Sequence, residues 1–131
     1  MSMTEDEWRQ AAFGAVCRGL ASQNWQKCGS QTSENGGCFY RPPAHLARMG
    51  IQACAAGWLM PDSKLTGYAP RTMGGYVDSY LDCIMDELQP VQDAQLLYEL
   101  QVLHDGSLGA NMRDRYVRYA SGHDLIVPEG C

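Results

Sequence analysis

Arginines accompanied by tyrosines recur along this sequence, and together they could hold a phosphate-bearing ligand. A planar guanidinium binds a phosphate through paired hydrogen bonds, and guanidinium groups and aromatic rings can both stack on a base. The densest group is the segment RDRYVR at residues 113–118. The candidate binding residues are Tyr40, Arg41, Arg71, Arg113, Arg115, Tyr116 and Arg118. The alternative is that Arg115 and Arg118 lie on an exposed helix face and pair with Asp114 or Asp124.

A second group of residues could bind a metal ion. Metal-dependent phosphohydrolases of the HD type use a histidine, then an adjacent His-Asp pair, then a later aspartate. Here His45, the pair His104 and Asp105, and Asp124 occur in that order. The order alone is weak support, because the three histidines of the chain can produce it by chance. The alternative is that His104 meets free carbonyls at the end of a helix and Asp105 caps the following turn.

Other signatures of catalysis are missing from the sequence. It has no serine elbow, no Cys-His arrangement and no G-K-S or G-K-T phosphate loop, so we assign no catalytic residue and no cofactor. The six cysteines contain no C-x-x-C pair, so a structural zinc site would have to be assembled across the fold. That zinc module stays open as an alternative. We expect free thiols, with Cys17, Cys54 and Cys83 buried as small hydrophobic residues.

Length and composition limit the class of protein. The chain has 131 residues, of which 45% are hydrophobic and 19% charged, as expected of a single globular domain over residues 1–131. Ten basic against fifteen acidic residues give a net charge of −5, which argues against generic nucleic-acid binding. The N-terminal segment has no secretory signal, and no apolar run is long enough for a membrane span. We expect a cytoplasmic protein that does not bind a membrane.

Four segments have the periodicity or caps of helices. Thr4 and Glu7 form a capping box that opens a helix over about residues 5–21. A second helix ends at Gly106 in a left-handed cap, and a last one covers about residues 111–122. The segment with the strongest helical period comes just before the helix that ends at Gly106. The short link between these two helices predicts that they pack as an antiparallel pair. The apolar positions of the first of the two are Val77, Tyr80, Leu81, Ile84, Met85 and Leu88.

Two short strands are predicted between the helical segments. Aromatic content favours a strand at residues 38–41, and an apolar run favours another at residues 51–55. They would form an antiparallel hairpin, with a helical turn over residues 44–49 at its tip. We therefore predict an α+β fold, mostly helical, in which three to four helices pack on a small antiparallel β-hairpin.

Three motifs give the sequence a resemblance to other proteins. They are C-x-Y-R at residues 38–41, C-A-x-G-x-L-x-P-D at residues 54–62 and L-Q-x-x-H-D at residues 100–105. Over roughly residues 5–125 the sequence resembles small, mostly uncharacterised proteins encoded by tailed bacteriophages. The link between the first two motifs is longer here than that pattern leads us to expect. The resemblance carries no defined chemistry.

Small non-structural phage proteins without catalytic signatures commonly act by binding, and often neutralise bacterial immunity. The resemblance therefore implies a non-catalytic antagonist of bacterial antiviral defence in the host cytoplasm, which inhibits a defence protein or sequesters a nucleotide second messenger. Inhibition would use an exposed patch, for which Trp25 and the tip at residues 39–49 are candidates. Sequestration would use a closed cationic pocket, often formed between two copies, so a homodimer is an alternative. The HD-type phosphohydrolase is the enzymatic alternative.

Overall fold

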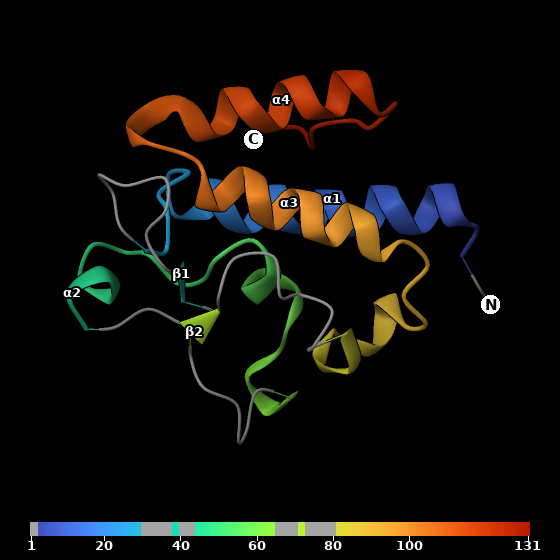
Figure 1. The fold of residues 1–131 in the computed structure, drawn as a ribbon, viewed down its shortest axis with the longest axis horizontal. Helices are drawn as coiled ribbons and strands as arrows, with labels where there is room; N and C mark the ends of the chain where they lie inside the picture. Colours follow the sequence, from blue (N-terminus) through green and yellow to red (C-terminus); the bar gives the residue numbers. More distant parts are fainter. Residues whose placement is uncertain (1–2, 30–37, 40–43, 65–70, 73–80) are drawn as a thin grey trace.

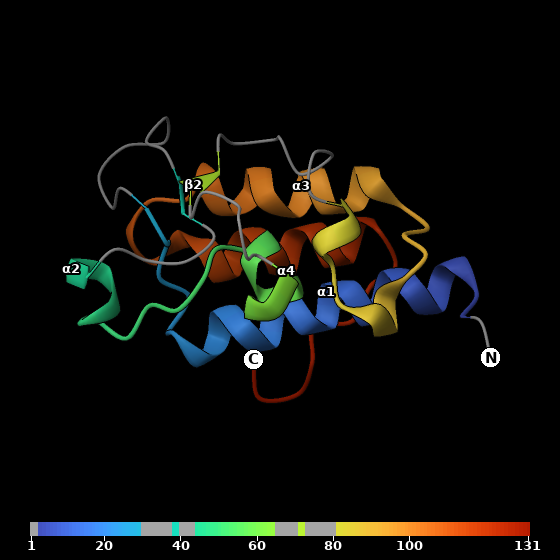
Figure 2. The same cartoon turned by 90° about the horizontal axis from the view of Figure 1, so that it is seen from below.

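Three α-helices make up most of the protein. The structure is a computed structural model, and it describes residues 3–29, 38–39, 44–64, 71–72 and 81–131. The long helices are α1 (Glu5–Ser22), α3 (Ala94–Asp105) and α4 (Met112–Gly122). Figures 1 and 2 show them side by side, with α1 and α3 running in the same direction and α4 returning in the opposite one. Among the described residues, no helix has the length and apolar character required to cross a membrane.

The start of α1 confirms the capping box. The Thr4 hydroxyl accepts from the Glu7 backbone N–H at 3.1 Å, and the Thr4 backbone N–H donates to Glu7 Oε1 at 2.9 Å. The helix packs most extensively on the 3₁₀ helix η1 (Ala56–Leu59). That close approach depends on Gly19, because a Cβ there would overlap the indole ring of Trp58. Gly19 therefore lets η1 approach α1 closely.

The predicted α+β class is wrong, because the described part of the chain is all-α. Residues 51–55 form no strand and lead into η1 instead. Within the described residues, β1 (Cys38–Phe39) pairs with β2 (Arg71–Thr72) in an antiparallel arrangement, with two residues in each strand. A pairing of this length forms no layer on which helices could pack. The expected tip is helical, since α2 covers Ala44–Ala47.

Within residues 51–55, the backbone of Gln52 and Ala53 bonds to a side chain. The amide of Gln23, just after α1, donates to the Ala53 carbonyl at 2.8 Å. Its Oε1 accepts from the backbone N–H groups of Gln52 and Ala53, at 2.9 and 3.2 Å. These bonds replace the partner strand that the prediction assumed.

The strongest predicted helix is also absent from the residues that the structure describes. Residues 73–80 lie outside the described part, and residues 81–90 form a short 3₁₀ turn and the 3₁₀ helix η4 (Asp86–Leu88). Residues 81–90 form hydrogen bonds with groups that are distant in the sequence. The indole N–H of Trp8 donates to the Leu88 carbonyl at 2.7 Å, and the Met85 N–H donates to the Leu59 carbonyl at 2.9 Å. The predicted antiparallel helix pair is therefore wrong, and α3 packs against α1 and α4 instead.

The two C-terminal helices match their predictions except at one cap. Helix α3 ends at the expected residue, but Gly106 has φ of −86° and is not left-handed. Helix α4 ends at Gly122, as predicted, and Asn111 stands at its N-cap position without a side-chain capping bond.

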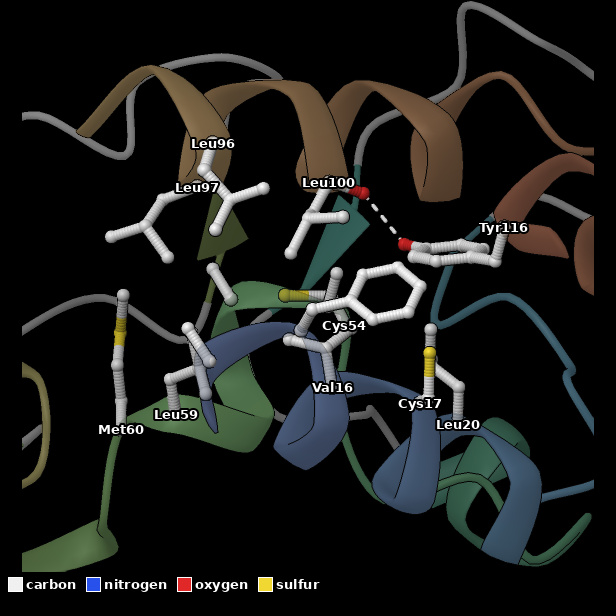
Figure 3. Close-up of a cluster of buried hydrophobic side chains, with 14 of the residues drawn as sticks. Val16, Cys17, Leu20, Cys54, Leu59, Met60, Leu96, Leu97, Leu100 and Tyr116 are labelled. Atoms are coloured by element: carbon white, nitrogen blue, oxygen red, sulfur yellow. Dashed lines mark hydrogen bonds between the residues drawn. The ribbon is translucent and has the colours of Figure 1, made fainter. Parts of the chain in front are cut away.

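One cluster of buried side chains joins the helices (Figure 3). Within this cluster, the Tyr116 hydroxyl donates to the Leu100 carbonyl at 2.6 Å, which ties α4 to α3. The residues labelled in the close-up are Val16, Cys17, Leu20, Cys54, Leu59, Met60, Leu96, Leu97, Leu100 and Tyr116.

Candidate functional site

A cleft of about 440 Å³ lies where α3 ends and α4 begins. Positions three, four and seven apart on a helix share one face, which brings the polar residues near the start of α4 to the same side. Gly106, the C-cap residue of α3, completes the wall. The cleft is lined by Gly106, Asn111, Asp114, Arg115 and Arg118. It therefore brings together two of the predicted arginines.

The Arg115 guanidinium lies against the end of α3. A Cβ built on Gly106 would come within 2.9 Å of Nη1 and 3.3 Å of Nη2 of Arg115. Glycine at this position therefore leaves room for the guanidinium. Because the last carbonyls of a helix carry partial negative charge, the cation also stabilises α3 there. Arg115 is held at the inner wall of the cleft, whereas Arg118 is exposed.

Among the described residues, no acidic side chain neutralises either arginine of the cleft. In the described part of the chain, the ion pairs involve Arg9, Lys64, His104 and His123. None of these pairs includes Arg115 or Arg118, so the alternative pairing with Asp114 or Asp124 is not found among the described residues. Both guanidinium groups keep hydrogen-bond donors and charge available for an anion.

Asn111 presents a donor to the same cleft. Its Oδ1 accepts from the Leu108 backbone N–H at 2.9 Å, which fixes the orientation of the side-chain amide. The amide nitrogen has no hydrogen-bond partner among the described residues. The cleft thus combines three donor groups with one carboxylate, that of Asp114.

Tyr116 does not belong to this site, contrary to the prediction. It is fully buried, packs against Phe13 and Trp25, and donates its hydroxyl hydrogen bond inside the core. Burial raises the pKa of Tyr116 well above its usual value. A ring in this position cannot stack on a ligand. Trp25, proposed as part of an exposed patch, is likewise partly buried against Tyr116, with ring centroids 5.6 Å apart.

The remaining predicted binding residues lie outside the cleft or beyond the described structure. Arg113 is exposed, and its Nε donates to the Cys131 carbonyl at 2.6 Å. Arg71 belongs to β2, where the backbone alone is described. Tyr40 and Arg41 lie outside the described residues.

His104 is a fully buried structural residue. Its Nε2 accepts from the Cys28 backbone N–H at 3.0 Å, so Nδ1 carries the hydrogen and donates to Asp105 Oδ1, also at 3.0 Å. Burial lowers the pKa of His104, with the bond to Asp105 opposing that effect. With both ring nitrogens engaged inside the protein, a metal ion could bind only by displacing these partners.

The four residues of the HD-type alternative are not assembled. His45 lies in α2, and Asp124 follows the C-terminal end of α4, which Figure 1 places at the opposite end of the molecule. Within the described ranges there is no group of three or more His, Cys, Asp or Glu side chains placed to hold a metal ion. Cys17, Cys54 and Cys83 are buried free thiols.

The motif L-Q-x-x-H-D has a structural role that sequence reasoning missed. Gln101 is buried, its Oε1 accepts from the Ala56 N–H at 2.8 Å, and its Nε2 donates to Asp105 Oδ1 at 2.7 Å. The spacing i, i+3, i+4 already placed Gln101, His104 and Asp105 on one face of α3. That face links α3 to η1 and to the segment after α1.

Sequence reasoning also missed Asn111 and Asp114 as cleft residues. Their signal was their helical spacing from Arg115 and Arg118. No protein-family model, curated protein or solved structure matches this chain. The function is therefore argued from the geometry of the cleft.

Proposed function

We propose that this protein is a non-catalytic, phage-encoded antagonist of bacterial antiviral defence that sequesters a phosphate-bearing nucleotide signal in the host cytoplasm. The observation that carries the proposal is the cleft at the junction of α3 and α4, lined by the guanidinium groups of Arg115 and Arg118, which form no ion pair within the described residues. Its volume of about 440 Å³ falls within the range of small-molecule sites. The phage resemblance supplies the biological setting.

The electrostatics favour local capture of an anion on an acidic protein. The net charge of −5 repels polyanions at long range, but that repulsion between exposed charges is screened by salt. Within the cleft, each guanidinium can form charge-assisted hydrogen bonds, each contributing about 1.5–3 kcal/mol. A small phosphate ester can reach both arginines, whereas a long nucleic-acid duplex would also be repelled by the net negative charge of the protein.

Two buried groups support binding over catalysis. The Cys54 thiol is fully buried, and this burial raises its pKa far above the usual value, which suppresses the nucleophilic thiolate. His104 is held neutral with both ring nitrogens bonded. Neither group can reach a ligand in the cleft.

Titration of a phosphate-ligand panel tests the proposal. Isothermal titration calorimetry would use GMP, AMP, cyclic di-GMP, cyclic di-AMP and ADP-ribose with the wild type, Arg118→Gln and Arg18→Gln. Arg18 is an exposed arginine of α1 outside the cleft, so its variant matches the charge change. We expect at least one ligand to bind, with affinity lowered about tenfold or more in Arg118→Gln and unchanged in Arg18→Gln. Absence of binding across the panel, or equal affinity in Arg118→Gln, would refute sequestration.

Direct inhibition of a defence protein is the second candidate, favoured by an exposed apolar stripe. Tyr98 and Val102 lie one turn apart on α3 and are 41% and 40% exposed. A plaque assay on bacteria that express a defence system separates the two mechanisms. Sequestration predicts that Arg118→Gln loses protection of the phage while Val102→Asp keeps it. Direct inhibition through α3 predicts the reverse.

A further inference from the structure

The carboxylate of Asp114 is out of place in a cleft that binds only phosphate. It is exposed at the wall shared with Arg115 and Arg118, and in the part of the chain that the structure describes it forms no ion pair. A carboxylate at this position repels any phosphate held by the arginines. It contributes favourably only when the ligand also brings hydrogen-bond donors.

Asn111 limits which donors and acceptors the ligand can present. Because its Oδ1 is occupied by the Leu108 N–H, its amide nitrogen is the end left to face a ligand. Asn111 and Asp114 are three positions apart, so they are neighbours on the surface of α4. The wall therefore offers a donor beside a two-oxygen acceptor.

Guanine is the base that complements this wall. Its Watson–Crick edge carries an acceptor, O6, followed by two adjacent donors, N1–H and the 2-amino group. Adenine and cytosine each place one amine beside an unprotonated ring nitrogen, whose lone pair would face a carboxylate oxygen. The adenine amine would also face the Asn111 amide donor. Uracil offers a single N–H between two carbonyls.

We propose that the cleft is selective for guanine nucleotides. Asp114 accepts from N1–H and the 2-amino group, Asn111 donates to O6, and Arg115 and Arg118 hold the phosphate. This inference rests on the proposed sequestering function, since it assigns the base that accompanies the phosphate in the same site. It goes beyond that function by naming residues that read the base.

Calorimetric titrations with GMP, IMP, AMP and inorganic phosphate test the assignment. The proteins are the wild type, Asp114→Asn and Glu87→Gln, the last an exposed carboxylate of η4 outside the cleft that matches the charge change. We expect the wild type to prefer GMP over AMP by roughly tenfold or more, with IMP between them because it lacks the 2-amino group. Asp114→Asn should weaken GMP binding yet strengthen binding of inorganic phosphate, while Glu87→Gln changes neither.

The outcomes separate this inference from the proposed function. If GMP and AMP bind the wild type equally and Arg118→Gln weakens both, guanine selectivity is refuted and phosphate sequestration stands. If Asp114→Asn keeps the full preference for GMP, Asp114 is not the residue that reads the base. If neither the nucleotides nor inorganic phosphate bind, guanine selectivity is refuted, and sequestration is refuted as well when the cyclic dinucleotides and ADP-ribose also fail to bind.

Discussion

The backbone N–H of Cys28 donates a hydrogen bond to Nε2 of His104, 3.0 Å away and 76 positions later in the chain. This bond sets the tautomer of the imidazole, because Nε2 must accept and Nδ1 must therefore carry the hydrogen that reaches Asp105. The residue that most suggested metal chemistry thus joins the segment after α1 to the end of α3. The burial of His104 therefore affects the stability of the fold.

Stability should depend on pH through His104. Burial lowers its folded-state pKa below the usual value of 6.5, so below that pH the unfolded chain binds more protons than the folded one. The free energy of unfolding is therefore fully retained above about pH 6.5 and falls as the pH decreases, with a slope approaching about 1.4 kcal/mol per pH unit. Urea denaturation between pH 5 and 8 measures it.

The matched variants for this slope are His104→Gln and His45→Gln. His104→Gln should flatten the pH dependence of the free energy of unfolding near pH 6. His45→Gln, which replaces an exposed histidine, should leave that dependence unchanged. An identical slope in His104→Gln and the wild type would show that other groups account for the dependence.

Tyr116→Phe should destabilise the fold without affecting the cleft. The change removes the hydroxyl that donates to the Leu100 carbonyl and leaves that carbonyl buried, at a cost of about 1 kcal/mol. Urea denaturation gives the loss, and calorimetric titration should give unchanged ligand affinity. Tyr98→Phe, at an exposed tyrosine, should alter stability by less than about 0.5 kcal/mol. A loss of affinity in Tyr116→Phe with stability intact would restore the ligand role.

Gly19→Ala and Gly122→Ala should have opposite effects. The added methyl at position 19 overlaps the Trp58 ring and must force α1 and η1 apart, at a cost of about 1–3 kcal/mol. At position 122 the methyl meets no atom within 4 Å, and alanine favours the last turn of α4, so stability should rise by up to about 1 kcal/mol. Thermal denaturation compares the two. Equal tolerance at both positions would contradict the close packing of α1 on η1.

The buried thiols should resist alkylation. Burial raises the pKa of Cys17 to about 12 and also raises that of Cys54, so both stay protonated at pH 8. N-ethylmaleimide should modify the partly exposed Cys131 before Cys17 and Cys54, which should react only after unfolding in urea. Peptide mass spectrometry resolves the sites. Rapid labelling of Cys54 in the folded protein would mean that its surroundings open to solvent.

Helices with local signals could be predicted from the sequence. Three signals each act within a few residues: the capping box at Thr4, the apolar period of α3 and the glycine at 122. An end of each of the three helices could therefore be predicted from the local sequence. Residues 51–55 and 81–90 could not be assigned in this way. Their backbone groups bond to distant partners, the Gln23 amide and the Trp8 indole, which no local pattern reveals.

The candidate site was only partly accessible to sequence reasoning. Helical spacing placed Arg115 and Arg118 near one another, but the same spacing groups Tyr116 with Met112 and Ala120, which are all buried. Attention to that apolar period would have removed Tyr116 from the binding set. The contribution of Gly106 depends on how α3 meets α4, which follows from tertiary packing alone.

Helix α1 is synthesised early, but several of its hydrogen-bond partners are synthesised much later. Its Trp8 bonds to Leu88, 80 positions away, and the side chain of Gln10 bonds to both backbone groups of Ile126, 116 positions away. During synthesis α1 therefore leaves the ribosome well before these partners, with its apolar face uncovered. A ribosome stalled before η1 would hold a nascent chain whose first helix lacks its main packing partner, a natural substrate for chaperones.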